Sequence, residues 1–229
     1  MPPTHNVGFR VFTQIQRPLA AVVAGPGKGE TTYVTDTMNR FGGMDANVRP
    51  VDPAMRLAGP AVAVRVPPGD YLMDYKAMEI AQPCDIIVIE ARGFTSVAQR
   101  GDLVSMIGRR LELGGMVTDG SLRDLAGIRA VRFPVFAADW LVPNGARRNG
   151  PGEVNVPVAV GGVPVLPGDV VLGDANGVVV VLRDDTAAVL EAARAVAEYE
   201  KVRLRESVEG QLIPSWLESS LREKGCEIL

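Results

Sequence analysis

Residues 101–124 (GDLVSMIGRRLELGGMVTDGSLRD) constrain the fold most, because they join an amphipathic helix directly to an apolar strand. Apolar residues spaced by three or four predict a helix over residues 103–113, with an amphipathic stripe formed by Leu103, Met106, Ile107 and Leu111. Gly114-Gly115 ends this helix. Residues 116–119 follow as a short strand, after which Gly120 turns the chain. A helix that leads at once into a buried strand is typical of α/β domains.

Helices and strands alternate up to about residue 137. Helices are predicted over residues 31–38 and 71–81, the second after the turn Pro67-Pro68-Gly69-Asp70, whose carboxylate can cap it. Strands are predicted over residues 59–66, 86–90 and 133–137. The continuous apolar run at residues 86–90 indicates a strand that is buried on both faces.

The second half of the chain is richer in strands. Short valine-rich strands, separated by glycine-containing turns, are predicted over residues 154–160, 163–166, 169–173 and 178–182. Asn176-Gly177 lies between two apolar runs, which predicts a hairpin. A long helix capped by Asp184 or Asp185 follows, and a short helix around residues 215–224 ends the chain.

These elements predict one α/β domain with mixed sheets over residues 31–185. Residues 1–30 precede it as an N-terminal extension, and residues 186–229 follow it as a helical tail. The extension contains the turn-rich run Gly25–Gly29, which lacks the Gly-Lys-Ser/Thr ending of an ATPase phosphate loop and is interpreted as a linker.

Composition argues against several classes of function. The 24 basic residues are outnumbered by 27 acidic ones, and no basic block exceeds short pairs such as Arg109-Arg110, so we expect no nucleic-acid binding. No apolar run approaches the ~20 residues that span a membrane, and the first residues lack the apolar core of a signal peptide. Cys84 and Cys226 lie too far apart in sequence for a metal-ligand pattern, which favours free thiols in a cytoplasmic protein.

The single histidine restricts the chemistry. His5 lies in a polar, proline-containing terminus that we expect to be frayed. A Ser-His-Asp triad, a Cys-His pair and a histidine-rich zinc site all need a positioned histidine. Catalysis in this chain is therefore expected to use carboxylates, arginine, lysine, backbone groups or a bound metal.

Residues 101–124 also contain the candidate site. Asp102 can cap the helix that begins at Leu103, so that the backbone amides of Leu103 and Val104 face a carboxylate ligand. Arg123-Asp124 follows a buried strand, and α/β proteins place ligands at the carboxyl ends of strands. The residues alone leave a simpler alternative open, in which Asp102 is only a helix cap and Arg123-Asp124 only a surface pair.

Four segments resemble, in kind and order, the RraA-like proteins, a family named for a regulator of ribonuclease activity. The segments are PPGDYLMDYKAMEIAQPCDIIVIEARG, GDLVSMIGRRLELGGMVTDGSLRD, FPVFA and VNVPVAVGGVPVLPGDVVLGDANGVVVV. The family includes 4-hydroxy-4-methyl-2-oxoglutarate aldolases and 4-carboxy-4-hydroxy-2-oxoadipate aldolases. The resemblance covers about residues 30 to 205, most of the chain.

The resemblance implies a three-layer β/β/α sandwich of the swivelling-domain type with a C-terminal helical extension. It also implies ring-shaped homotrimers, sometimes stacked as hexamers, with the active site between subunits. The implied activity is that of a class II aldolase, which uses Mg²⁺ or Mn²⁺ and releases pyruvate from a 4-hydroxy-2-oxo diacid. Oxaloacetate decarboxylation is the expected companion activity, because it passes through the same pyruvate enolate.

The family's site residues transfer to matching positions of this chain. Gly101, Asp102, Leu103 and Val104 would cradle the pyruvyl carboxylate. Arg123 would bind the oxo-acid oxygens and stabilise the enolate, and Asp124 would ligate the metal. Asp102, directly or through a water, is the candidate base for the 4-hydroxyl proton.

One position departs from the expected pattern. Aldolases of this family often carry an acidic residue three places after the metal-binding aspartate, and here that place is Gly127. Loss of a residue that orients metal-bound water predicts weaker metal binding, a substitute acid or a different substrate. Glu200, on the predicted long helix, could reach a neighbouring subunit's site, although a solvated helix face explains it more simply.

Two other functions compete with the aldolase. The first is a non-catalytic regulator that binds ribonuclease E, as some family members do; the intact Arg123-Asp124 pair favours catalysis over it. The second is methyl transfer, a label that relatives have carried. No glycine-rich loop follows a first strand with an acidic ribose partner, which argues against it.

Overall fold

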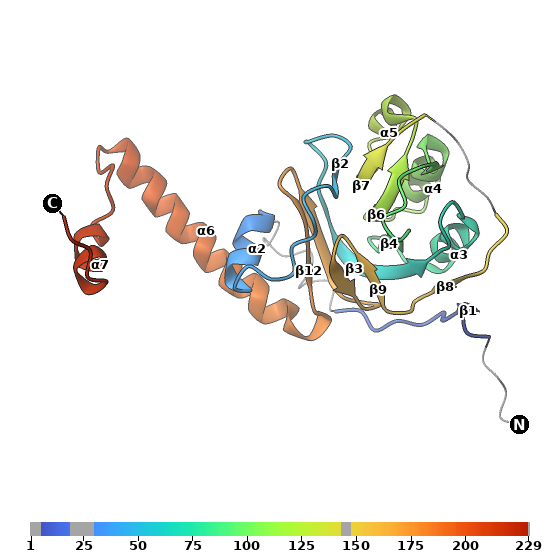
Figure 1. The fold of residues 1–229 in the computed structure, drawn as a ribbon, viewed down its shortest axis with the longest axis horizontal. Helices are drawn as coiled ribbons and strands as arrows, with labels where there is room; N and C mark the ends of the chain where they lie inside the picture. Colours follow the sequence, from blue (N-terminus) through green and yellow to red (C-terminus); the bar gives the residue numbers. More distant parts are fainter. Residues whose placement is uncertain (1–5, 19–29, 143–147, 229) are drawn as a thin grey trace, which may run out of the picture.

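The structure, a computed structural model, describes residues 6–18, 30–142 and 148–228. These residues form a ten-stranded mixed sheet, a separate two-stranded hairpin and helices on both sides (Figure 1). The predicted α/β class with a C-terminal helical extension is confirmed. No helix in these ranges has the length and apolar character needed to cross a membrane.

Four parallel strands form the centre of the sheet. In spatial order they are β3 (Leu57–Arg65), β4 (Ile86–Glu90), β6 (Gly115–Leu122) and β7 (Val135–Trp140). The edges are formed by β2 (Arg49–Pro50) beside β7, and by β8 (Gly152–Val154) and β1 (Phe9–Val11) beyond β3. The predicted N-terminal extension therefore contributes one strand to the sheet.

The remaining strands build a second layer. β11 (Val170–Asp174) pairs antiparallel with both β3 and β12 (Gly177–Val181), which confirms the hairpin predicted from Asn176-Gly177. β9 (Val158–Val160) and β10 (Val163–Val165) form the separate hairpin. Among the described strands, β5 (Ala98–Arg100) pairs with β6 alone.

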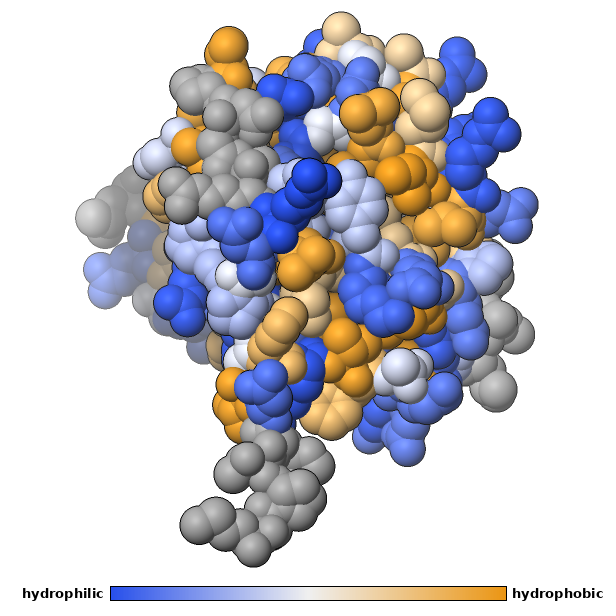
Figure 2. Space-filling model, turned by 90° about the vertical axis from the view of Figure 1, so that its right-hand side faces the viewer, coloured by the Kyte–Doolittle hydropathy of each residue, from blue (hydrophilic) through white to orange (hydrophobic). Residues whose placement is uncertain are grey.

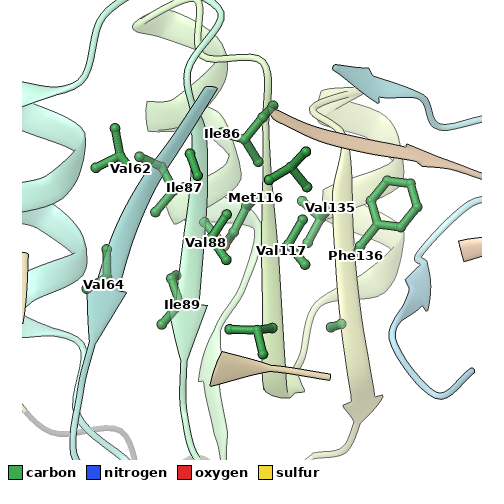
Figure 3. Packing of buried hydrophobic residues seen from close by; sticks show 14 of the residues in the cluster. Val62, Val64, Ile86, Ile87, Val88, Ile89, Met116, Val117, Val135 and Phe136 are labelled. Atoms are coloured by element: carbon green, nitrogen blue, oxygen red, sulfur yellow. The ribbon is translucent and has the colours of Figure 1, made fainter. Parts of the chain in front are cut away.

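The core lies between and beside the central strands. Figure 3 shows Val62 and Val64 of β3, the apolar run of β4, and side chains of β6 and β7 packed across neighbouring strands. Ile86, Ile87, Val88 and Ile89 are all fully buried. A strand covered on both faces needs apolar residues at every position, which explains why this run does not alternate.

Helices cover both sides of the strands. α3 (Leu72–Ile80), α4 (Asp102–Arg110) and α5 (Leu125–Val131) lie together on one side (Figure 1). α2 (Thr31–Thr37) and α6 (Thr186–Val208) pack against each other near β12, and α7 (Leu217–Glu223) follows at the far end of α6. A second apolar cluster, which includes Val34, Leu172, Val179 and Leu190, joins these helices to β11 and β12.

Two strand predictions were wrong. The strand predicted over 116–119 continues to Leu122, because Gly120 does not turn the chain: a Cβ there would lie 2.9 Å from the Cβ of Ala91, so the glycine permits close packing of an extended strand. The strand predicted over 154–160 is interrupted between β8 and β9. At the break Asn155 has a left-handed φ of 58°, and Pro157 has no N–H for a ladder bond.

Candidate active site

The candidate site lies where two neighbouring parallel strands end. β6 ends at Leu122 and β7 at Trp140, which face each other in register, and the N–H of Leu141 donates to the carbonyl of Leu122 at 2.9 Å. Arg123 and Asp124 continue directly from β6. The carboxyl ends of adjacent parallel strands are where open α/β sheets bind ligands.

A cavity of about 390 Å³ opens at this edge of the sheet. Its described lining residues come from the ends of the two strands and the start of α5: Arg123, Asp124, Leu125, Trp140, Leu141 and Val142. The side chains of Arg123 and Asp124 are 43% and 40% exposed, and Arg123 Nε lies 3.2 Å from Asp124 Oδ2. A cation and a carboxylate are thus held side by side within reach of a dissolved molecule.

Asp124 is held in an unusual backbone conformation. It precedes the first residue of α5 with φ 60° and ψ 39°, in the left-handed region, and its carbonyl accepts the N–H of Ile128 at 3.0 Å. Aspartate tolerates this region better than most residues do. Its carboxylate lies against the backbone of Gly101, since a Cβ at position 101 would be only 2.3 Å from Asp124 Oδ2. A side chain at position 101 would therefore have to displace the Asp124 carboxylate.

Asp102 does not cap α4, contrary to the sequence prediction. Gly101 occupies the N-cap position, Asp102 is the first helical residue, and no side chain caps this helix start in the described part of the chain. The carboxylate of Asp102 instead lies across the start of α5, where a Cβ on Gly127 would be 2.4 Å from Asp102 Oδ2. The two carboxylates are thus exchanged between helix starts, with Asp124 over Gly101 and Asp102 over Gly127.

This exchange gives a physical reason for the unexpected glycine at position 127. An acidic side chain there would need the volume that the Asp102 carboxylate already fills. Gly127 therefore makes room for the Asp102 side chain, which lies within 3 Å of where a Cβ at position 127 would be.

The other predicted site residues lie on the first turn of α4. The side chain of Leu103 is 69% exposed, whereas Val104 is buried. Because no side chain caps this helix in the described residues, the first-turn amides are not engaged by a cap. Gly101, Asp102, Arg123 and Asp124 come together through the contacts described above.

The end of β7 and the residues after it form part of the cavity wall. Trp140, Leu141 and Val142 line the cavity, and the guanidinium of Arg49 lies over the Trp140 ring, 4.6 Å from its centroid. These wall residues could not be assigned from the sequence, because it does not reveal that Leu122 of β6 lies opposite Trp140 of β7. His5 and Gly25–Gly29, named in the sequence analysis, lie outside the described residues.

Other candidate groups lie apart from the cavity lining or have structural partners. Asp119 is buried in β6, and its carboxylate accepts the N–H groups of Ala91 at 2.6 Å and Gly93 at 2.8 Å. Burial raises the pKa of Asp119, while these two hydrogen bonds oppose the rise. Glu200 accepts a hydrogen bond from the Tyr33 hydroxyl at 2.7 Å. Cys84 and Cys226 are free and exposed.

The residues present fit a magnesium-type ion more than a tightly caged metal. No group of three or more His, Cys, Asp or Glu side chains within the described ranges could enclose a metal. Mg²⁺, however, is usually bound by one or two carboxylates while it keeps several waters and contacts the substrate. The half-exposed carboxylate of Asp124, beside a cavity, satisfies that requirement.

Known proteins match most of this chain. The profile of the family described as "RraA-like: Aldolase/RraA" matches residues 31–180. A protein of Halalkalibacterium halodurans, named "Putative 4-hydroxy-4-methyl-2-oxoglutarate aldolase", is 36% identical over 164 residues, which are 72% of this chain and 78% of that protein.

Solved structures share the fold. An uncharacterized protein from Pseudomonas syringae pv. tomato superposes with a TM-score of 0.74 at 23% identity, covering 86% of this chain and 96% of that one. Streptomyces coelicolor RraAS2, described as an unusual member of the RNase ES inhibitor RraA protein family, gives a TM-score of 0.71 at 24% identity, covering 82% and 100%.

Proposed function

Because the chain belongs to the RraA-like family, we propose that it is a divalent-metal-dependent carbon–carbon lyase that cleaves a 4-hydroxy-2-oxo diacid into pyruvate and a carbonyl product. The observation that carries this proposal is the pairing of Arg123 with Asp124 beside a cavity, where the Asp124 carboxylate lies over Gly101 at the start of α4. The substrate class follows the name of the 36% identical relative.

Each site residue has a distinct role in the proposed reaction. Arg123 binds the oxo-acid oxygens and stabilises the negative charge that develops on the 2-keto oxygen. The first-turn amides from Gly101 to Val104 hold the pyruvyl carboxylate. Asp124 would hold Mg²⁺ or Mn²⁺, which supplies Lewis-acid chemistry to the keto acid when bound.

Asp102 is the proposed base. It accepts the proton of the 4-hydroxyl group while the C3–C4 bond breaks, so that the C4–O group becomes the carbonyl of the departing product. The electron pair of the broken bond passes to the pyruvyl fragment as an enolate, and protonation at C3 gives pyruvate. Oxaloacetate loses CO₂ through the same enolate, so decarboxylation of oxaloacetate is a direct assay of the site.

The testing experiment measures pyruvate release from oxaloacetate with added Mg²⁺ or Mn²⁺, and again with excess EDTA. We expect turnover that EDTA abolishes and added metal restores, together with a large loss in Arg123→Met. Turnover that is equal with and without metal, or no turnover with any divalent cation, would contradict the proposal.

A second candidate function is regulation by protein contact. The family description names RraA beside aldolase, and Streptomyces coelicolor RraAS2 is described as belonging to an RNase ES inhibitor family. A regulator that acts by contact does not need the carboxylate of Asp124. Inhibition of ribonuclease E by both wild type and Asp124→Asn, without lyase activity in either, would favour this role.

We also propose that the active molecule is a homotrimer or a hexamer. On the face that Figure 2 turns toward the viewer, apolar side chains gather in several patches among polar ones. α4 exposes Leu103, which follows Asp102 of the candidate site, together with Met106 and, at its C-terminal end, Leu111; exposed apolar side chains of this kind are typical of a surface that another chain covers. Light scattering coupled to size exclusion tests this, and a stable monomer at assay concentration would contradict a shared site.

A further inference from the structure

Arg100 connects the two halves of the candidate site through its backbone. It is the last residue of β5 and directly precedes Gly101 and Asp102 at the start of α4. Its carbonyl oxygen accepts the N–H of Arg123 at 3.0 Å. A displacement of Arg100 would therefore move both the start of α4 and the backbone of Arg123.

The side chain of Arg100 is buried against α3. Its Nε lies 2.6 Å from Oδ2 of Asp74, and both side chains are only 1% exposed. Its Nη1 also donates to Oε1 of Gln99, the preceding residue. Burial raises the pKa of Asp74, and the neighbouring charge of Arg100 opposes that rise.

Stability alone does not explain this pair. Asp74 Oδ1, Arg100 Nη2 and Gln99 Nε2 are buried and make no hydrogen bond to any residue in the described ranges. Unpaired buried polar atoms cost free energy, and apolar side chains of similar volume often replace a buried ion pair without loss of stability. A buried pair of this kind is better explained by the placement that it enforces.

β5 needs such a constraint. It has three residues, and β6 is its one partner among the strands that the structure describes. Its register shifts between Ala98, opposite Ser121, and Arg100, opposite Leu122. An irregular register weakens the backbone ladder locally. The contact with Asp74 ties the end of β5 to α3, which packs on β3, β4 and β8 in the body of the domain.

We propose that Asp74 and Arg100 form a positioning pair that fixes the start of α4 relative to Arg123 and Asp124. The pair contacts no substrate and acts through Gly101 and Asp102; its catalytic consequence rests on the proposed lyase function. The start of α4 and Asp124 are in close contact, since a Cβ at Gly101 would be 2.3 Å from Asp124 Oδ2.

The double variant Asp74→Leu/Arg100→Met tests this pair, since it removes both charges at similar volume. We expect a folded protein whose kcat for Mg²⁺-dependent oxaloacetate decarboxylation falls by about tenfold or more, the range seen for residues that orient catalytic groups. We also expect faster amide hydrogen exchange at Ser105 and Arg123, whose N–H groups donate to the carbonyls of Gly101 and Arg100. Arg17→Met is the matched control, because it removes an arginine from the buried Asp85 at the opposite end of the strands.

Arg17→Met should lose stability while kcat and the exchange rates of the Ser105 and Arg123 amides stay at wild-type values. Wild-type kcat and unchanged exchange in the folded double variant would overturn the positioning role. If the double variant does not fold, Asp74→Asn provides the same test, with the same two readouts and the same overturning result. If the wild-type protein has no lyase activity, the proposed function fails, but the exchange rates still decide whether the pair fixes α4.

Discussion

The two ends of the parallel strands hold their carboxylates in opposite ways. At the amino end, Asp85 accepts hydrogen bonds from Arg17 Nε at 2.9 Å, from Arg17 Nη2 at 2.6 Å and from the N–H of Gln82 at 2.7 Å. At the carboxyl end, Asp102 and Asp124 accept no hydrogen bond from a described residue; Arg123 Nε lies 3.2 Å from Asp124 Oδ2, and the same carboxylate lies over Gly101. A carboxylate whose oxygens accept several hydrogen bonds stabilises local structure. An exposed carboxylate without such donors keeps its lone pairs available for a ligand.

Cavity size alone would place the candidate site at the amino end of the parallel strands. A cavity of about 600 Å³, larger than the one beside Arg123, lies at the amino end and is lined in part by Asp85 and Asp174. Asp174, however, accepts hydrogen bonds from the N–H and hydroxyl of Thr31 and from the N–H of Asn176. Unused hydrogen-bonding capacity, more than volume, therefore distinguishes the candidate site.

Among the substitutions considered, removal of the Asp124 charge should reduce catalytic activity the most. Asp124→Asn keeps the shape, and asparagine also tolerates the left-handed backbone. We expect metal-dependent oxaloacetate decarboxylation to fall by about 100- to 1000-fold, because Lewis-acid stabilisation contributes several kcal/mol to such reactions. Asp85→Asn is the control at the other end, and an equal loss of activity there would remove the contrast between the two ends.

The variant Gly127→Ala tests whether activity depends on the position of the Asp102 carboxylate over the start of α5. Gly127→Ala places a Cβ 2.4 Å from Asp102 Oδ2, so the Asp102 carboxylate must move. We expect activity to fall by about 10- to 100-fold, as for other groups that orient a catalytic site, without loss of helix propensity in α5. Gly43→Ala is the matched control, since its Cβ meets only Thr35 Cγ2 at 3.6 Å. Wild-type activity in Gly127→Ala would separate Asp102 from the chemistry.

Much of the fold and part of the site follow from local sequence. The apolar run of β4 and the helical spacing in α4 each specify one element, and Arg123-Asp124 lies at a strand end because a buried strand precedes it. The direction of Asp102 could not be predicted. A carboxylate that caps its own helix and one that reaches a neighbouring helix have the same Gly-Asp sequence, and only the approach of α5, permitted by Gly127, decides between them.

Gly120 shows the same limit in the backbone. A glycine after a short apolar run predicts a turn, but here β6 continues through it to Leu122. The close approach of Ala91 and Gln99 is what requires a residue without a side chain. That contact joins segments far apart in sequence, so no local pattern could reveal it.

A substitution at the amino end of the parallel strands should lower stability without changing catalysis. Arg17→Met removes two charge-assisted hydrogen bonds from the buried Asp85 carboxylate. We expect the free energy of unfolding in urea to fall by about 1–3 kcal/mol, with kcat unchanged below the unfolding transition. A selective loss of kcat in this variant would extend the functional site to the amino end.

The smallest change in stability is expected from loss of the hydrogen bond between Tyr33 of α2 and Glu200 of α6. The hydrogen bond to Glu200 raises the pKa of Tyr33 to about 12, so the bond stabilises the fold below pH 10 and is lost as the pH rises through about 12. At neutral pH Tyr33→Phe should slightly speed amide exchange in α6 near Glu200 and leave kcat unchanged. Reduced kcat in Tyr33→Phe would instead give this exposed contact a part in catalysis.

The most direct measurement is Mn²⁺ binding, followed by electron paramagnetic resonance, in wild type and Asp124→Asn, with and without oxalate as a mimic of the pyruvate enolate. The account predicts one Mn²⁺ per chain in wild type, tighter binding when oxalate is present, and neither effect in Asp124→Asn. Equal Mn²⁺ binding by the two proteins, or binding that oxalate does not change, would contradict a keto-acid and metal site at the carboxyl end of β6.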